Sequence, residues 1–477
     1  MASDGKWTIK LDNFNAGYSP LAFTDSLTEE GGGGHASIMS NVDVLDKKLT
    51  QGPGLATLTN GTQAGVVTEL INFIMDKAVA TDTTYAIGNT KLFKLSATTV
   101  ASGGTPSWPR TIINMTEGSS VTDIGGNVYY FYNTATGAAI GKYDQTTTFN
   151  DTWTTASMVK APHPAATKED IMCFGNGQYL GTYISTTDVI APTKLDFGDG
   201  NQVDDVLFSG NSWYIAVNSD VTGTNRSSGQ IYLYDGSAIP TTLDDETGVG
   251  MSRIGFLYRL NGIIYVAYQD LSSSGFIIGY IYDSQIKALG RFNGTLPNFQ
   301  QKTLYKNTIL FLSSGLVYSG GALVDELPFQ LSQHADGGYA TAGAIAAPFG
   351  VPMIASSEST SYKLAKFSGY DTNCSWESIV FPLSGGKMKG YVDNIIVMTN
   401  NLGSSARCDL VIKGDQETLT STTQQITGTS KRRHCFSNFG LSTLEDFKIS
   451  LSFAEGSVTN IVKVRAIIIN GHWVASA

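Results

Sequence analysis

The sequence predicts an all-β protein: a β-propeller of about seven blades with an extended N-terminal arm and a C-terminal β-sandwich, jelly-roll-like in type. Between Gly118 and Trp376 one unit recurs, made of an apolar strand, a tight Gly/Asn turn, an aromatic strand, a polar loop and a third strand. Successive copies start roughly 35–52 residues apart, the spacing of propeller blades. Charged residues make up only 15% of the chain and glycines number 52, as in all-β proteins rich in tight turns.

The clearest copies of the unit lie at Ile124–Asp144, Phe208–Gly236 and Tyr258–Asp283, and weaker copies begin at Phe174, Tyr305 and Val351. Each copy is a meander of about four strands that cannot bury both of its faces alone. Neighbouring copies are therefore expected to stack around an axis.

The repeat pattern and the apolar/polar alternation change along the chain and predict three segments. These are an extended arm at residues 1–65, the propeller at 66–376 and the sandwich at 377–477. In the arm, Gly31–Gly34 is typical of a hinge. The stretch Asn41–Leu58 alternates apolar and polar residues around a Gly-Pro-Gly turn and is expected to be extended. A strand from this stretch is expected to complete the last blade and close the ring.

Period-two alternation supports the strands of the two larger segments. Leu70–Met75, Thr84–Ile87 and Lys91–Leu95 are predicted as strands of the first blade. In the C-terminal segment, apolar residues at 447, 449, 451 and 453 alternate with Lys448, Ser450 and Ser452. This alternation predicts a sheet with one buried face, and helix is expected to be nearly absent.

Charge and composition exclude several classes of protein. A net charge of -10 disfavours a surface that grips nucleic acid, and the basic run Lys431–His434 is predicted to be a solvated loop. Met1–Lys10 lacks an apolar signal-peptide core, and no stretch approaches about eighteen apolar residues. We therefore expect no membrane-spanning segment and synthesis in a cytosol. The cysteines, expected to be free and buried, are Cys173, Cys374, Cys408 and Cys435.

No catalytic constellation is recognisable. The nearest match to a sialidase-type Asp box, Phe149–Trp153, lacks the glycine and the spacing, and the chain has no GxSxG elbow or P-loop. The histidines sit singly, without HxH or HExxH spacing. We accordingly predict no catalytic, cofactor-binding or metal-binding residues, no cofactor and no enzymatic activity. The histidines are His35, His163, His334, His434 and His472.

An acidic stretch and a set of recurring aromatic residues each allow two interpretations. The stretch Asp196–Asp205 places four carboxylates and an amide near two flexible glycines, which suits either a calcium loop or, more simply, an acidic turn between blades. Aromatic residues recur at equivalent blade positions and are expected to pack between blades, with a minority available to stack on sugars. They are Tyr129, Tyr130, Tyr132, Trp213, Tyr214, Tyr265 and Tyr268.

The N-terminal arm resembles the start of tail proteins from tailed bacteriophages, of the nozzle or tail-tip type. The chain departs from the pattern at Gln51-Gly52-Pro53-Gly54, where many such proteins have Arg-Pro-Gly. The resemblance covers the arm by motif and the rest of the chain by architecture only. The residues that carry it are Asn13, Phe14, Gly17, Asn41, Val42, Asp43, Leu49, Pro53, Gly54 and Leu58.

This resemblance implies a homo-oligomeric ring around a DNA exit channel in the virion tail, made in the host cytoplasm. The implied partners are other phage tail proteins (adaptor and fibres), with the genomic DNA passing without specific binding. The expected function is thus a non-catalytic structural protein of a phage tail that acts through subunit interfaces. The alternatives are a propeller lectin or receptor-binding adhesin that recognises a host surface glycan, and a glycan-cleaving enzyme whose carboxylates converge from distant blades.

Overall fold

The computed structural model describes most of the chain, and its contacts divide the chain into two units. Unit 1 comprises Met1–Leu55, Val317–Asp336 and Ser368–Ala477, and unit 2 comprises Ala56–Leu316 and Gly337–Phe367. The predicted boundaries after residues 65 and 376 stay predictions. The described residues are 5–12, 14, 36–40, 42–45, 48–64, 72–76, 83–88, 90–104, 107–219, 228–236, 241–245, 251–270, 275–283, 285–321, 330–334, 342–358, 361–371, 374–383, 388–400, 402–403, 406–428, 432–454 and 461–475.

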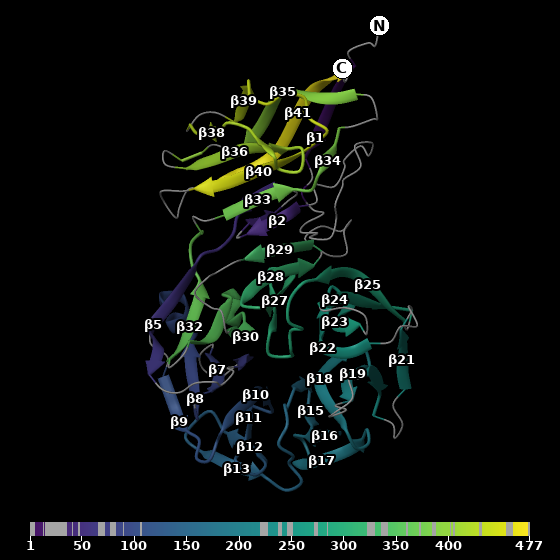
Figure 1. Ribbon diagram of the computed structural model, residues 1–477. Helices are drawn as coiled ribbons and strands as arrows, with labels where there is room; N and C mark the ends of the chain where they lie inside the picture. The colour runs from purple at the N-terminus through teal and green to yellow at the C-terminus, as the bar shows by residue number, and fades with distance from the viewer. Residues whose placement is uncertain are drawn as a thin grey trace. The chain divides into compact units, whose positions relative to one another are not determined.

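Unit 2 consists of short antiparallel meanders, most of them of four strands (Figure 1). The first three meanders form separate sheets, and the fourth and fifth are joined by a short parallel pairing of β21 with β25. Their strands are β6 Asn72–Asp76, β7 Thr83–Gly88, β8 Lys91–Ser96, β9 Ser107–Thr111; β10 Glu117–Ile124, β11 Asn127–Asn133, β12 Ala138–Tyr143, β13 Phe149–Thr154; β14 Ala165–Lys168, β15 Ile171–Asn176, β16 Tyr179–Ile184, β17 Val189–Asp196; β18 Asn201–Ser209, β19 Ser212–Ser219, β20 Gly229–Tyr234, β21 Thr241–Asp245; β22 Met251–Leu260, β23 Ile263–Asp270, β24 Phe276–Tyr282 and β25 Gln285–Phe292.

Later in the chain, unit 2 contains the hairpin of β26 (Lys302–Tyr305) and β27 (Thr308–Ser313), and then a four-stranded sheet with the order β30-β31-β32-β5. The strands of this sheet are β30 Ala342–Ala346, β31 Met353–Glu358, β32 Ser361–Phe367 and β5 Leu55–Ala64. The predicted strand from the N-terminal segment therefore does complete the last sheet of the unit.

The tight turn of the repeat explains its Gly/Asn signature. Between β10 and β11, Gly125 and Gly126 have φ of 58° and 74°, and between β22 and β23 Asn261 and Gly262 have φ of 50° and 83°. Two consecutive positive φ angles give a turn whose twist matches that of the flanking strands, and glycine and asparagine tolerate this conformation best. The sequence signal and the backbone geometry therefore agree.

Seven strands, each from a different meander, contact one another in a closed cycle; most are the first strand of their meander, and β27 is the second strand of its hairpin. β6 contacts β10, and the contacts continue through β14, β18, β22 and β27 to β30, which contacts β6 again. Figure 1 shows β10, β18, β22, β27 and β30 of this cycle around a common centre. This circular arrangement of antiparallel meanders has β-propeller character, and the predicted all-β class is confirmed for the described residues. The helical elements described are only α1 (Ala97–Ser102) and the 3-10 turn η1 (Pro348–Gly350).

Unit 1 consists of two sheets. The first has the order β3-β4-β41-β35-β39, with β1 also paired to β41, and the second runs from β28 and β29 through β2, β33 and β40 to β36. The strands are β1 Lys6–Leu11, β2 Ala36–Ser40, β3 Val42–Leu45, β4 Lys48–Gln51, β28 Leu316–Gly321, β29 Gln330–His334, β33 Cys374–Ser378, β34 Phe381–Pro382, β35 Met388–Thr399, β36 Arg407–Gly414, β37 Leu419–Thr420, β38 Gln424–Ile426, β39 Arg433–Ser437, β40 Asp446–Ala454 and β41 Lys463–Ala475.

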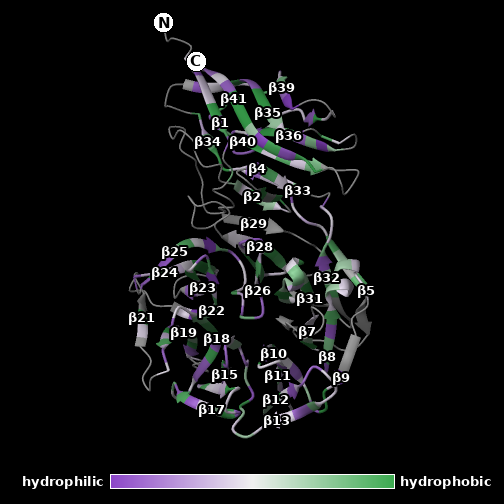
Figure 2. Ribbon diagram, turned by 180° about the vertical axis from the view of Figure 1, so that it is seen from behind, coloured by the Kyte–Doolittle hydropathy of each residue, from purple (hydrophilic) through white to green (hydrophobic). Residues whose placement is uncertain are grey.

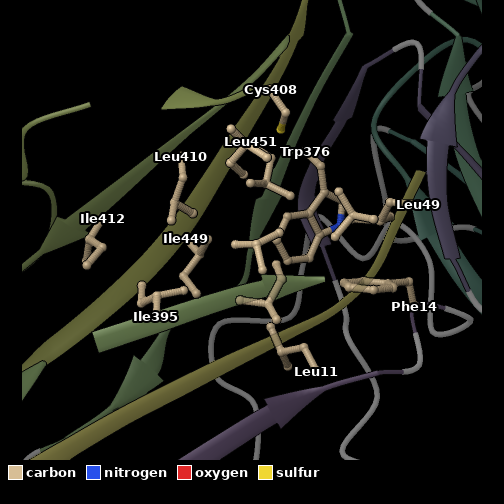
Figure 3. Packing of buried hydrophobic residues seen from close by; sticks show 14 of the residues in the cluster. Leu11, Phe14, Leu49, Trp376, Ile395, Cys408, Leu410, Ile412, Ile449 and Leu451 are labelled. Carbon is tan, nitrogen blue, oxygen red and sulfur yellow. The ribbon is translucent and has the colours of Figure 1, made fainter. Parts of the chain in front are cut away.

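A single hydrophobic core lies between these two sheets (Figure 3). The predicted alternation in β40 is confirmed: Phe447, Ile449, Leu451 and Phe453 are buried, whereas the residues between them are partly or fully exposed. Figure 2 shows the same banding of hydrophobic and hydrophilic residues along β36 and β40. Each strand thus gives one face to the core and the other to its surroundings.

The N-terminal segment is part of this core. Phe14 is fully buried, and its ring meets that of Trp376 edge-on, with the ring centroids 5.5 Å apart. Val42 and Leu49 are also fully buried, and Figure 3 shows Leu49 beside Trp376. Phe14, Val42 and Leu49 of the tail-protein motif therefore act inside this chain as core residues. Asn13, Gly17, Asn41 and the hinge Gly31–Gly34 lie outside the described residues.

The cysteine prediction is confirmed in part. All four thiols are free, and Cys173, Cys374 and Cys408 are buried, but Cys435 is exposed on β39. The run Lys431–His434 was predicted to be a solvated loop, and this is wrong for Arg433 and His434, which belong to strand β39. Arg432 and Arg433 are exposed as expected, His434 is buried, and Lys431 lies outside the described residues. Within the described ranges, no helix has the length and apolar character needed to cross a membrane.

The burial of Phe14 gives a direct test of the structural role of the N-terminal segment. Phe14→Ala removes a buried ring, so it should lower the free energy of unfolding of unit 1 by about 3–5 kcal/mol. Lys6→Ala, in the exposed part of β1, should leave it nearly unchanged and serves as the control. Urea denaturation followed by tryptophan fluorescence measures both. Equal stability of the two variants would contradict the packing described here.

Candidate ligand-binding cavity in unit 2

A cavity of about 510 Å³ lies within unit 2. It is bordered by the first halves of three strands of the contact cycle, β10, β18 and β22, and by the loop that precedes β26. A volume of this size is ordinary for the site of a small ligand. The lining residues are Glu117, Gly118, Ser119, Asn133, Pro162, Asp204, Arg253, Ile254, Gly255, Gln269, Gly294, Thr295, Leu296, Pro297, Asn298, Phe299 and Gln300.

Asp204 is held in place by two side-chain amides. Gln202 Nε2 donates to one carboxylate oxygen and Asn218 Nδ2 donates to the other. Asn218 also bonds the backbone of Ile254: its Oδ1 accepts from the amide nitrogen at 2.7 Å, and its Nδ2 donates to the carbonyl oxygen at 2.7 Å. The amide of Asn218 thereby joins β19 to β22 and fixes the position of the carboxylate at the cavity wall.

Next to Asp204, Asp205 forms a buried ion pair with Lys302. Asp205 also accepts from the backbone N–H of Leu257 at 2.6 Å, and Lys302 donates to the carbonyl of Leu257 at 2.6 Å. Burial raises the pKa of the Asp205 carboxyl and lowers the pKa of the Lys302 ammonium, while their mutual attraction opposes both shifts. The pair links β18, β22 and β26 immediately behind the cavity wall.

On the opposite wall, Glu117 is the first residue of β10 and is exposed to solvent. Asn133 Nδ2 donates to one of its carboxylate oxygens at 3.1 Å. The other carboxylate oxygen has no hydrogen-bond partner among the described residues, so Glu117 offers a free hydrogen-bond acceptor to a ligand. The side-chain amide of Gln300 already has a partner within the protein, because its Nε2 donates to the carbonyl of Ser119 at 2.7 Å.

Close backbone packing shapes the third wall. A Cβ atom on Gly255 of β22 would lie 2.0 Å from the carbonyl oxygen of Pro297 in the loop before β26. Any side chain at this position would push the loop away from the strand. Glycine is therefore required at residue 255 by the approach of the loop that lines the cavity.

His163 is buried beside the cavity, and its burial changes the pKa of its imidazole. Its backbone N–H donates to Ser119 Oγ at 2.6 Å, and its ring lies 6.0 Å from that of Phe131. Nδ1 lies 2.9 Å from the carbonyl oxygen of Gly175, so Nδ1 carries the proton, and Nε2 has no hydrogen-bond partner among the residues that the structure describes. Burial disfavours the imidazolium and lowers the pKa of His163 to about 4. The ring is therefore neutral at pH 7.

The acidic stretch Asp196–Asp205, considered above as a calcium loop or a turn, does not form a single loop. Asp196 ends β17, and its Oδ1 accepts from Gln178 and from the amide of Gly198, both at 2.8 Å, whereas Asp204 and Asp205 lie inside β18. The acidic stretch is thus part turn and part strand. No three His, Cys, Asp or Glu side chains gather into a possible metal site within the described part of the chain.

The recurring aromatic residues pack between and within sheets, as predicted. Tyr129, Tyr130 and Tyr132 are almost fully buried. Tyr130 OH donates to Asp151 Oδ1 at 2.6 Å, and the carboxylate of Asp151 also accepts from Arg110, which ties β13 to β9. These rings therefore stabilise the ring of meanders and are not exposed stacking platforms. Trp213, Tyr265 and Tyr268 are also buried, and Tyr214 is partly buried.

Among the other histidines, His434 is buried on β39 near Thr399 Oγ1, and His472 Nδ1 lies 2.8 Å from Asp393 Oδ1. His35 lies outside the described residues. Glu117, Arg253 and Gln269 were not predicted from the sequence, because isolated polar residues match no motif. Their signal is positional: each lies at the first or last positions of a strand of the repeat, at the same end of the meanders.

Comparison with known proteins gives similarity to solved structures only, since no family model and no curated protein matches the chain. One similar structure is the extracellular domain of a hybrid two component system from B. thetaiotaomicron, with 14% identity and a TM-score of 0.45, covering 81% of this chain and 47% of that chain. The present chain thus spans about half of that structure's length.

Two others are glycoside hydrolases. An exo-β-1,3-galactanase from Phanerochaete chrysosporium matches with 9% identity and a TM-score of 0.30, covering 64% of this chain and 95% of that chain. A family 43 arabinoxylan arabinofuranohydrolase from Bacillus subtilis matches with 9% identity and a TM-score of 0.29, covering 92% and 96% respectively.

These matches contradict the prediction that the chain is not an enzyme, because glycoside hydrolases are among the structures that it resembles. The missing sequence motif therefore does not exclude catalysis. With TM-scores below 0.5, the similarities carry no activity or substrate over to this chain.

The buried neutral His163 predicts a pH dependence of stability. Because its pKa is lowered from 6.5 to about 4 on folding, the unfolded chain takes up the proton first as the pH falls. The contribution is fully present above about pH 6.5 and is lost towards pH 4, by about 3 kcal/mol. His163→Asn, whose amide replaces the Nδ1–H donor, should lack this component. Urea melts of both proteins at pH 7 and pH 4 measure it, and parallel pH profiles would disprove the assignment.

Proposed function

We propose that unit 2 is a seven-bladed β-propeller that binds a cell-surface carbohydrate in the cavity between β10, β18 and β22. The observation that carries the proposal is the polar lining of this cavity, where Glu117, Asp204, Arg253 and Gln269 come together from three meanders. The closed contact cycle, with one strand from each of seven meanders, supports the blade count.

The chemistry of the lining suits a saccharide. Sugar hydroxyls both donate and accept hydrogen bonds, so they require carboxylates, amides and guanidinium groups in one site. Glu117 supplies an acceptor, Arg253 and Gln269 supply donors, and Ile254 and Leu296 supply the apolar contacts that a sugar ring needs. Asp204 is already held by Gln202 and Asn218, so the site is organised before a ligand arrives.

A glycan array followed by isothermal titration calorimetry tests this function. Glu117→Ala removes a charged acceptor and should weaken binding of the saccharide found on the array about tenfold or more. Asp199→Asn changes an exposed carboxylate in the turn before β18, away from the cavity, and should bind like the unchanged protein. The proposal fails if no saccharide binds, or if Glu117→Ala binds as tightly as the control.

A second candidate function is that of a bacteriophage tail component, in which unit 1 is a β-sandwich and copies of the chain assemble into a ring in the virion tail. The observation that favours it is the N-terminal motif, whose residues Phe14, Val42 and Leu49 are core residues of unit 1. The motif thus specifies a folded unit and not a loose extension. The two functions are compatible, since a tail protein that recognises the host needs a ligand site.

Electron microscopy of the purified chain, alone and with the virion of its source, tests the second candidate. Rings of several copies around an axial hole, and the same rings at the virion tail, are the expected result. Single molecules without higher assembly, together with absence from purified virions by mass spectrometry, would end this candidate. That outcome would leave the carbohydrate site untouched.

A further inference from the structure

Arg253 is a free cation at the cavity wall. It lies on β22 with an exposed side chain, and the structure gives it no ion pair or hydrogen bond to any described residue. Both carboxylates that share the cavity have protein partners instead: Asp204 is held by two amides and Glu117 by Asn133.

Gln269 lies directly beside Arg253. The two residues are register partners in the antiparallel pair of β22 and β23, and both line the cavity. Opposed residues in such a pair have their Cβ atoms about 5 Å apart on the same face of the sheet. The side-chain amide of Gln269 has no hydrogen-bond partner among the described residues either. The guanidinium of Arg253 and the carboxamide of Gln269 can therefore both donate hydrogen bonds to a ligand.

A ligand that covers Arg253 must supply an acceptor for its charge. Removing an unpaired guanidinium from water is costly, and the cost is offset only when a charged or strongly accepting group replaces the water. A carboxylate matches the planar fork of a guanidinium with two parallel hydrogen bonds, and such charge-assisted pairs are about twice as strong as neutral ones. The hydroxyls of a neutral sugar offer weaker compensation.

We propose that the cavity is specific for an acidic saccharide, and that Arg253 and Gln269 bind the carboxylate of its uronic acid unit. This inference rests on the proposed carbohydrate function. Glu117, at the start of β10, accepts from hydroxyls elsewhere on the sugar. The overall charge of -10 gives no long-range attraction for an anion, so recognition depends on this short-range pairing.

Calorimetric titration with an oligogalacturonate and with its methyl ester provides the test. The unchanged protein should bind the acid at least about tenfold more tightly than the ester, since only the acid forms the charged pair. Arg253→Gln should remove this preference and Arg253→Lys should retain part of it. Gln269→Glu should reject the acid and still bind the ester, because two carboxylates would then face each other.

Arg259→Gln is the matched control, because Arg259 is exposed on the same strand and does not line the cavity. It should keep both affinities, and circular dichroism checks that every variant is folded. Equal binding of acid and ester, or a preference that survives Arg253→Gln, overturns the inference while leaving carbohydrate binding standing. Absence of binding for every acidic and neutral saccharide tested overturns both proposals together.

Discussion

Closure of the ring of meanders is the constraint on which unit 2 depends. Each meander is apolar on both faces, so every sheet needs a neighbour on each side, and an open row would leave two apolar sheet faces in water. The contact from β30 back to β6 removes those two ends. The pairing of β5 with β32 then completes the final sheet with a strand from the other end of the repeat array. Closure therefore requires residues far apart in sequence to meet.

The same constraint produces the cavity. Because the first strands of the meanders converge on a common centre, polar residues at their starts face one another at short range. Asp205 tolerates burial there because Lys302 and the backbone of Leu257 come from neighbouring meanders to satisfy it. Asn218, on β19 of the same meander, donates to the carboxylate of Asp204. A wall made of residues fixed in this way presents a ligand with donors and acceptors whose positions are set in advance.

Local patterns in the sequence were sufficient for many of the strands and turns. The positive φ angles at Gly125, Gly126 and Gly262, and the alternation from Phe447 to Phe453, are properties of a few consecutive residues. The cavity was not predictable in this way, because Glu117, Asp204 and Arg253 are brought together by closure and share no spacing in sequence. The N-terminal segment was likewise expected to be an arm that contacts neighbours, whereas Phe14 and Leu49 fill the core of unit 1. Which partner a strand finds depends on long-range packing.

The position of β5 in the chain has a consequence for synthesis. Its partner β32 begins at Ser361, so roughly 300 residues must follow before the last sheet of unit 2 can be completed, which takes a ribosome about 15–60 s. The delay before pairing is even longer for strands β1 and β4, because both pair with β41 near the end of the chain. During this interval the early strands expose unpaired edges and apolar side chains on the nascent chain. Completion of both units is thus a late event in synthesis.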